Sequence, residues 1–198
     1  KRTKEYKVAS FGQTKQANYF WEKPQSNSEE GLEIKFDGLS YQTKLYGTYN
    51  LSNLAAALAF GALFNVPTDG IQNALLNFVS ENNRSQIITI HHTQYVLDAY
   101  NANPTSMLAA LQTFDKKAKS NKAVVLGDML ELGDTSAEEH QELVKLCLKL
   151  SFKKIIVIGP CFSATTLNDN RILKFKNLET FKKSLDHSNW NFSHVLIK

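Results

Sequence analysis

Several signals that would place a protein in a broad class are missing from this chain of 198 residues. No apolar run approaches the length needed to span a bilayer, and the first residues, KRTKEYK, lack the apolar core and cleavage site of a secretory signal. The two cysteines, Cys147 and Cys161, have neither metal-ligand spacing nor the pattern of a disulfide framework. We therefore expect a cytoplasmic protein without a membrane partner. Because the first residue is not Met, we also expect a piece of a longer chain.

Three common catalytic or nucleotide-binding motifs are missing as well. The chain has no G-x-x-x-x-G-K-[ST] loop, no G-x-G-x-x-G after a strand and no nucleophile elbow. The net charge of +4 comes mostly from lysines in scattered groups, at residues 1–7, 116–122 and 174–183. A nucleic-acid-binding protein concentrates its basic residues on one face, with arginine or aromatic residues among them. We therefore expect no nucleic-acid partner.

The 42% of hydrophobic residues indicates a globular protein, and the pattern changes character near residue 85. In residues 1–85, LEIKFDGLSYQTKLYG alternates apolar and polar residues around Asp37-Gly38, which predicts a β-hairpin. The Ala- and Leu-rich run that follows predicts a helix capped by Asn50, and TDGIQNALLNFV predicts a second helix capped by Thr68 or Asp69.

In residues 86–198, short apolar runs alternate with helical patterns. The runs SQIITIHH, QYVLDA, KAVVLG, KKIIVIG, RILKF and HVLIK predict strands, and the segments between the later ones predict helices. Near-continuous apolar strands that alternate with helices are typical of a parallel sheet covered on both faces. The sequence therefore predicts an α/β fold, with a Rossmann-like, mostly parallel sheet in this second segment.

Polar residues and glycines follow the predicted strands directly. Asp98 comes after QYVL, Gly127-Asp128 after AVVL, Gly159 after IIVI and Lys198 after HVLI. Ligands of open parallel sheets bind at the carboxyl ends of the strands. This edge is the predicted site.

The stretch DAYNANPTSM contains the most unusual of these junctions. Asn103 and Pro104 suit the cap and first position of the helix that follows. That leaves Asp98, Tyr100 and Asn101 without a structural role. An acid at this position can accept hydrogen bonds from both hydroxyls of a ribose, and the amides at the helix start can meet an anion. The alternative is a loop acid without a ligand.

A second polar stretch, LGDMLELGDTSAEEH, permits two interpretations. Ser136 and Glu139 match a capping box. Four of its side chains could form a metal site, namely Asp128, Glu131, Asp134 and His140. However, acids at a helix start are favoured by the helix dipole, so we favour a substrate-recognition loop without a metal.

Two of these stretches, with a third, resemble one enzyme family. GTYNLSNLAAALA is similar to the G-x-H-N-x-x-N-A-x-A-A segment of the Mur ligases, the ATP-dependent amide ligases of peptidoglycan precursor synthesis. YNANPTSM, followed by LGDMLELG and then a His, resembles the members that add D-alanyl-D-alanine to a UDP-N-acetylmuramoyl-tripeptide. By this resemblance, residues 1–85 match the end of the family's central ATP-binding domain and residues 86–198 its C-terminal ligase domain.

The resemblance implies a ligase that uses ATP and Mg²⁺, of which this chain is an inactive part. The phosphate-binding loop, the metal ligands and all catalytic residues are expected upstream. Asn53, Arg84 and Asp98 match the family's nucleotide-binding positions. Tyr49 stands where the family often has His, and no Gly precedes Arg84, which are two departures from the pattern.

The dipeptide side of the site is assigned to three further residues, Asn101, Asp128 and His140. We expect a monomer whose partners are the UDP-linked tripeptide and D-alanyl-D-alanine. The alternative hypothesis is a stand-alone nucleotide-binding regulatory module without catalysis. An NAD-dependent enzyme is disfavoured because the glycine fingerprint is missing.

Overall fold

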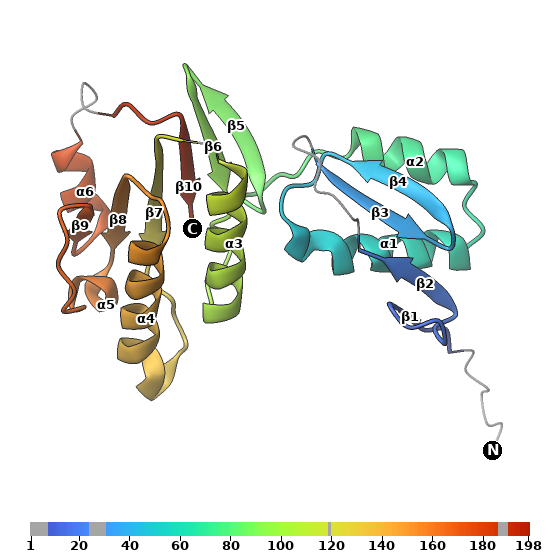
Figure 1. Ribbon diagram of the computed structural model, residues 1–198, viewed down its shortest axis with the longest axis horizontal. Helices are drawn as coiled ribbons and strands as arrows, with labels where there is room; N and C mark the ends of the chain where they lie inside the picture. The colour runs from blue at the N-terminus through green and yellow to red at the C-terminus, as the bar shows by residue number, and fades with distance from the viewer. Residues whose placement is uncertain (1–7, 24–30, 119, 186–189) are drawn as a thin grey trace. The chain divides into compact units, whose positions relative to one another are not determined.

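The chain folds into two compact units, Lys1–Val79 and Ser80–Lys198. The computed structural model describes residues 8–23, 31–118, 120–185 and 190–198. In Figure 1 the first unit is coloured from blue to teal and the second from green to red. The sequence predicted a boundary after residue 85. The structural division places the segment 80–85 in the second unit, where Ser85 hydrogen-bonds Asp98.

Within residues 8–23 and 31–79, the first unit contains a four-stranded sheet in the order β1-β2-β3-β4 and two α-helices. Strands β1 and β2 are parallel, and the pairs β2–β3 and β3–β4 are antiparallel. The elements are β1 (Phe11–Gly12), β2 (Tyr19–Glu22), β3 (Leu32–Phe36), β4 (Leu39–Thr43), the 3₁₀ turn η1 (Thr48–Asn50), α1 (Leu51–Leu63) and α2 (Thr68–Asn77).

The predicted hairpin is confirmed as β3–β4. Its two-residue turn places Asp37 at φ 47° and Gly38 at φ 83°, the left-handed conformations that suit the twist of a tight hairpin. Side chains on alternate residues of β3 point inward, so Ile34 is buried whereas Lys35 is exposed. The alternation that predicted the hairpin therefore also builds the core of this unit.

Helix α1 buries an apolar stripe against this sheet, and its buried side chains are Leu51, Leu54, Ala55, Leu58 and Ala59. The predicted side-chain caps of α1 and α2 are wrong. Asn50 is the residue before α1, but its side chain does not cap the helix. Its side-chain amide donates to the Tyr46 carbonyl at 2.8 Å, and the 3₁₀ turn already leads into the helix. Pro67 is the cap residue of α2, so Thr68 is already helical.

In its described residues, the second unit contains a six-stranded sheet and four α-helices. Its elements are β5 (Gln86–Ile90), β6 (Thr93–Leu97), α3 (Pro104–Lys117), β7 (Lys122–Gly127), the 3₁₀ turn η2 (Gly133–Thr135), α4 (Ser136–Lys149), β8 (Lys154–Ile158), α5 (Pro160–Ser163), β9 (Ile172–Phe175), α6 (Leu178–Ser184) and β10 (His194–Ile197). The strand order is β5-β6-β10-β7-β8-β9. Among the strands that the structure describes in this sheet, β5 alone runs antiparallel to its neighbour, which confirms the mostly parallel α/β sheet.

The last strand, β10, lies between β6 and β7 near the middle of the sheet. Its residue Ile197 pairs with Leu97 on one side and Val125 on the other. The crossovers β6–α3–β7, β7–α4–β8 and β8–α5–β9 all progress in one direction, whereas β9–α6–β10 returns. Since parallel crossovers are right-handed, the return places α6 on the face opposite α3 and α4.

Both faces of this sheet are covered. Helices α3 and α4 lie side by side on one face, as Figure 1 shows. Their buried apolar side chains recur at helical spacing and are Met107, Ala110, Leu111, Phe114, Leu143, Val144 and Cys147. On the other face Phe181 of α6 packs with Val125 and Ile156. The strand β7 is buried from Lys122 to Leu126, which explains the apolar run from Ala123 to Leu126.

The helix caps of this unit follow the sequence prediction in one case and not in the other. Asn103 caps α3, because its side chain accepts from the Ser106 amide at 2.9 Å, and Pro104 is the first helical residue. Both predictions for this junction are confirmed. The predicted capping box of Ser136 and Glu139 is wrong: Ser136 is already helical, and the cap residue is Thr135.

At the amino-terminal edge of the sheet, the buried Lys122 pairs with the partly buried Asp115. The Lys122 ammonium lies 2.8 Å from Asp115 Oδ1 and donates to the Ala118 carbonyl, and its side chain is 3% exposed. The amide and hydroxyl of Ser151 also donate to Asp115 Oδ1. Asp115 therefore joins the end of α3 to the start of β7 and to the turn after α4.

No helix in the described residues is long and apolar enough to cross a membrane.

Asp115→Asn should destabilise the protein in a pH-dependent way. Burial opposes ionisation of Asp115, but the hydrogen bonds from Lys122 and Ser151 outweigh it and lower the pKa of this carboxyl below the usual 3.8. A lowered pKa stabilises the fold above pH 3.8, and this contribution is lost as the pH falls through the folded value. Urea unfolding should show a loss of about 2 kcal/mol at pH 7. The loss should shrink only as the pH falls below 3.8.

Glu142→Gln is the matched control for this substitution. Glu142 pairs with Lys145 on the exposed face of α4, and its side chain is 57% exposed. Its loss should change the free energy of unfolding by less than about 0.5 kcal/mol. Equal effects of the two substitutions at pH 7, or a loss at Asp115 that does not vary with pH, would contradict this account.

Candidate functional site

The carboxyl-terminal edge of the second sheet gathers the side chains that follow its strands. Asp98 follows β6, Lys198 follows β10 and Asp128 follows β7. Backbone hydrogen bonds hold these ends in register: the Asp98 amide donates to the Ile197 carbonyl at 2.9 Å, and the Gly127 amide donates to the Lys198 carbonyl at 2.7 Å. The strand order therefore places Lys198 between the two acids.

The carboxylate of Asp98 joins three segments of this edge. Its Oδ2 lies 2.8 Å from the Lys198 ammonium, and the two side chains are 13% and 4% exposed. Its Oδ1 accepts from both the amide and the hydroxyl of Ser85, each at 3.0 Å. The Lys198 ammonium also donates to the Asn101 carbonyl at 3.1 Å. Asp98 thus connects β10, the segment before β5 and the loop that follows β6.

Arg84 lies beside this network and stacks on Tyr100. The centre of its guanidinium is 3.7 Å from the centroid of the Tyr100 ring, a distance suited to a cation–π contact. The backbone around Arg84 is unusual, because Asn82, Asn83 and Ser85 have φ values of 57°, 57° and 56°. Such left-handed residues cost about 1 kcal/mol each and persist where other contacts hold them. The bonds from Ser85 to Asp98 are such contacts.

A pocket of ≈ 270 Å³ opens next to this network. Asn101 and Asp128 both line it, together with Tyr100, Leu130 and Lys198. The Asn101 side-chain oxygen accepts from the Ala102 amide at 2.9 Å, which folds the loop back on itself. Two of the residues predicted for the dipeptide therefore share one pocket, and the pocket adjoins the residue predicted for the ribose.

Asp128 also has a structural role. Its carboxylate oxygens accept from the amides of Cys161 and Phe162, at 2.8 and 2.9 Å, at the start of the short helix α5. This contact requires a glycine at position 159. A Cβ there would lie 2.2 Å from the Asp128 carboxyl carbon, and the φ of Gly159 is 136°. Asp128 therefore fixes the loop after β8 to the end of β7.

His140 is fully buried and supports the loop that follows β7. Its Nε2 accepts from the Met129 amide at 3.0 Å, and its Nδ1 lies 2.6 Å from the Ser136 carbonyl, to which it donates. This pattern fits the neutral ring with the proton on Nδ1. The imidazole edge also packs against Phe162, with ring centroids 4.5 Å apart. By binding the Met129 amide, His140 fixes the loop that carries Leu130, which lines the pocket.

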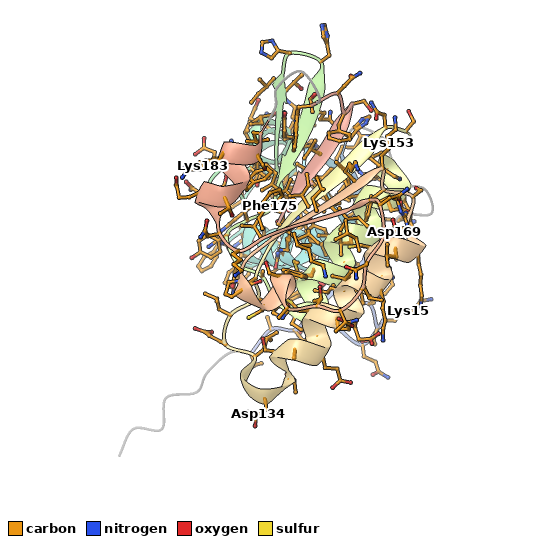
Figure 2. The ribbon with its side chains drawn as sticks, turned by 90° about the vertical axis from the view of Figure 1, so that its left-hand side faces the viewer. Lys15, Asp134, Lys153, Asp169, Phe175 and Lys183 are labelled. Atoms are coloured by element: carbon orange, nitrogen blue, oxygen red, sulfur yellow. The ribbon has the colours of Figure 1, made fainter. Side chains whose placement is uncertain are left out.

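The predicted alternative of a metal site takes a different form in the structure. Asp134 lies at the outer turn before α4 and points away from the sheet, as Figure 2 shows, and Glu131 is exposed. Cys161, instead, comes within 4.8 Å of Asp128 and His140. The Asp128 oxygens and His140 Nε2 already accept backbone amides. These bonds explain the cluster without a metal ion.

Asn53, predicted to contact the nucleotide, belongs to the first unit. It lies on the exposed side of α1, and its amide donates to the Asn50 side-chain oxygen at 3.3 Å. The structure thus divides the predicted residues between the units, with Asn53 in the first and the other five in the second.

Ser85 and Lys198 were not predicted as site residues, although both bind Asp98. The signal for Lys198 was its position directly after an apolar strand, where a charged side chain meets the edge of the sheet. The signal for Ser85 was weaker, because a serine after an arginine in a polar loop is ordinary. Its left-handed backbone is visible only in the folded chain.

Comparison with known proteins finds one matching family profile. Residues 83–183 match the family described as "Mur ligase, glutamate ligase domain". The match thus covers the segment with Arg84 and Ser85, the loop after β6 and the helices α3 to α6.

Similar proteins occur among curated sequences and among solved structures. The UDP-N-acetylmuramoyl-tripeptide–D-alanyl-D-alanine ligase of Treponema pallidum is 30% identical over 85% of this chain and 38% of its own length. A crystal structure of MurF from Acinetobacter baumannii is 25% identical, with a TM-score of 0.76 over 96% of this chain and 42% of that one. MurF from Thermotoga maritima in complex with ADP shares the fold at 20% identity, with a TM-score of 0.73 over 94% of this chain and 43% of its own. This chain therefore spans about two fifths of these relatives.

Gly159→Ala should destabilise the second unit more than Gly133→Ala does. Both glycines have positive φ, but a Cβ at Gly133 meets nothing within 4 Å, whereas one at Gly159 collides with Asp128. We expect a loss of about 1 kcal/mol for Gly133→Ala and about 3 kcal/mol or more for Gly159→Ala, measured by urea unfolding. Similar losses at both positions would mean that the contact between Asp128 and α5 does not hold this edge.

Proposed function

The chain belongs to the Mur ligase family, and we propose that it is part of a UDP-N-acetylmuramoyl-tripeptide–D-alanyl-D-alanine ligase of peptidoglycan synthesis. Three of its sequence stretches resemble this member of the family, and curated relatives from Treponema pallidum and Bacillus subtilis carry this name. Residues 1–85 would be the end of the central ATP-binding domain, and residues 86–198 the C-terminal ligase domain.

The proposed reaction has two steps. An oxygen of the tripeptide carboxylate attacks the γ-phosphorus of ATP, which forms an acyl phosphate and releases ADP. The amine nitrogen of D-alanyl-D-alanine then attacks the acyl carbon, loses a proton and expels inorganic phosphate. Positioning and charge neutralisation carry most of the catalysis in such transfers. We assign the groups that perform it to parts of the ligase that this chain does not span.

In this proposal, the chain contacts parts of the nucleotide other than the phosphate that reacts. The observation that carries the proposal is the convergence of Asp98 and Arg84 at the carboxyl edge of a parallel sheet. Asp98 is held by Ser85 and Lys198, and Arg84 by the ring of Tyr100. A fixed carboxylate suits a ribose hydroxyl, and a permanent cation suits a phosphate. For Asn53, on α1 of the first unit, nucleotide binding stays a prediction from the sequence.

The pocket beside Asp98 is proposed to receive the dipeptide. Asn101 and Asp128 line it, and their polar atoms could meet the backbone amide and the amine of D-alanyl-D-alanine. His140 would act indirectly, because its ring holds the Met129 amide and thereby the loop that carries Leu130. Since the pocket adjoins Asp98, the amine would enter next to the bound nucleotide.

The Mg²⁺ that accompanies ATP in such reactions does not fit the metal-ligating cluster of the described residues. Mg²⁺ prefers oxygen ligands. The cluster offers one carboxylate with a histidine and a cysteine, and both carboxylate oxygens accept backbone amides. We therefore assign the metal ligands to the rest of the ligase. We also propose a cytoplasmic location, because ATP and the UDP-linked tripeptide are cytoplasmic solutes. The monomeric state stays a prediction.

Asp98→Asn tests the nucleotide assignment in the complete ligase that contains this chain. Asn keeps an oxygen and the shape of the side chain but loses the charge that strengthens a hydrogen bond to a ribose hydroxyl. The kcat/KM for ATP should fall roughly tenfold or more, mainly through KM. The kinetics with saturating ATP and varied D-alanyl-D-alanine should change much less.

Asp134→Ala is the control, because Asp134 is an exposed acid that points away from the sheet. Its kinetics should match those of the unaltered ligase. Unchanged ATP kinetics in the Asp98→Asn variant would remove Asp98 from the nucleotide site. If the unaltered protein shows no ATP-dependent ligation of D-alanyl-D-alanine, the proposed function itself is wrong.

A further inference from the structure

We propose that Lys198 is a positioning residue of the nucleotide site, which aims Asp98 at the ribose and fixes the loop 98–103. The inference rests on the proposed function and deepens it, since it assigns the recognition of the ribose to a pair of residues. From the sequence, Lys198 was predicted only to lie at the end of a strand.

The position of Lys198 is fixed by backbone hydrogen bonds to the neighbouring strand. Its amide donates to the Val125 carbonyl at 2.9 Å, and its carbonyl accepts from the Gly127 amide at 2.7 Å. The side chain therefore starts from a rigid point near the middle of the sheet. It is only 4% exposed, so the ammonium depends on protein oxygens in place of water.

Two oxygens of the 98–103 loop meet this ammonium. Asp98 Oδ2 lies at 2.8 Å, which is the length of a charge-assisted hydrogen bond, and the Asn101 carbonyl lies at 3.1 Å. The loop is also held at its two ends, by Ser85 on Asp98 Oδ1 and by the cap of Asn103 on α3. Lys198 supplies the fixing point between these ends.

The hydrogen bonds of Asp98 determine how it can meet a ribose. A carboxylate offers about four acceptor positions. Ser85 fills two on Oδ1 and Lys198 fills one on Oδ2. The remaining position is on Oδ2, the oxygen that Lys198 holds. Asp98 in this arrangement accepts one ribose hydroxyl, where the sequence suggested two. The direction in which Asp98 Oδ2 accepts this hydrogen bond depends on Lys198.

The test compares ATP with 2′-deoxy-ATP and 3′-deoxy-ATP in the complete ligase. The unaltered enzyme should discriminate roughly tenfold or more against one analogue and little against the other, because one hydroxyl meets a charged acceptor. Lys198→Met keeps the length of the side chain without its charge. In this variant the KM for ATP should rise, and the discrimination should fall to within about threefold of unity.

Two further variants separate positioning from folding. Lys154→Met is the matched control, since the Lys154 ammonium also donates to a carbonyl, that of Asn170 at 3.0 Å, but at the amino-terminal end of β8. It should keep the full discrimination. If Lys198→Met does not fold, as judged by thermal unfolding, Lys198→Gln replaces it, because Gln retains donors without the charge.

A double variant tests whether Lys198 acts through Asp98. Asp98→Asn should already abolish most of the discrimination, and adding Lys198→Met should remove little more. A folded Lys198 variant that loses ATP affinity but keeps the wild-type preference for one hydroxyl would overturn the inference, since it would reveal a structural role alone. Equal use of ATP and both analogues by the unaltered ligase would instead overturn the ribose assignment of Asp98.

Discussion

The ion pair between Asp98 and Lys198 depends on the place of β10 between β6 and β7. A strand that enters a sheet between two others brings its carboxyl end between theirs. Lys198 then emerges next to the loop after β6 and the end of β7, with its backbone bonded to β7. The contacts with Ser85 and Asn101 follow from this arrangement. The last strand thus organises a site whose other residues come from segments far earlier in the chain.

The two edges of the second sheet differ in the polar groups that they leave exposed. At the amino-terminal edge, Lys122 and Asp115 join helix ends and turns. Arg171 similarly donates to the carbonyls of Leu148 and Leu150 at the end of α4 and pairs with Asp169. At the carboxyl-terminal edge, Tyr100 and Asn101 remain exposed beside a pocket. Charged groups therefore stabilise both edges, and the carboxyl-terminal edge also has exposed polar groups beside its pocket.

Local signals in the sequence predicted local structure well. The Asp37-Gly38 turn, the Asn103-Pro104 helix start and the apolar strands each depend on neighbours within a few residues, and all are confirmed. The proposed caps at Asn50 and Ser136 failed for a local reason as well. In both cases a 3₁₀ turn leads into the helix, so the helix start needs no side-chain acceptor at that residue.

The long-range features could not be predicted in this way. Nothing near residues 194–198 indicates between which strands they will lie, so the pairing of Lys198 with Asp98 was hidden. The contact of Asp128 with the start of α5 was hidden for the same reason, because it joins residues more than thirty positions apart. His140 matched a family pattern, yet its hydrogen bonds to Met129 and Ser136 appear only in the folded loop.

Calorimetric titration with Mg-ATP, performed on this chain and on the complete ligase that contains it, tests the central claim most directly. The claim is that the carboxyl edge of the second unit supplies one part of a nucleotide site and that most of the phosphate contacts lie elsewhere in the ligase. We predict that the complete ligase binds ATP and that this chain alone gives no measurable heat of binding, because its contacts reach only the ribose and one phosphate region. Binding by this chain with micromolar affinity would contradict the claim. It would indicate a complete nucleotide site here and a stand-alone nucleotide-binding module.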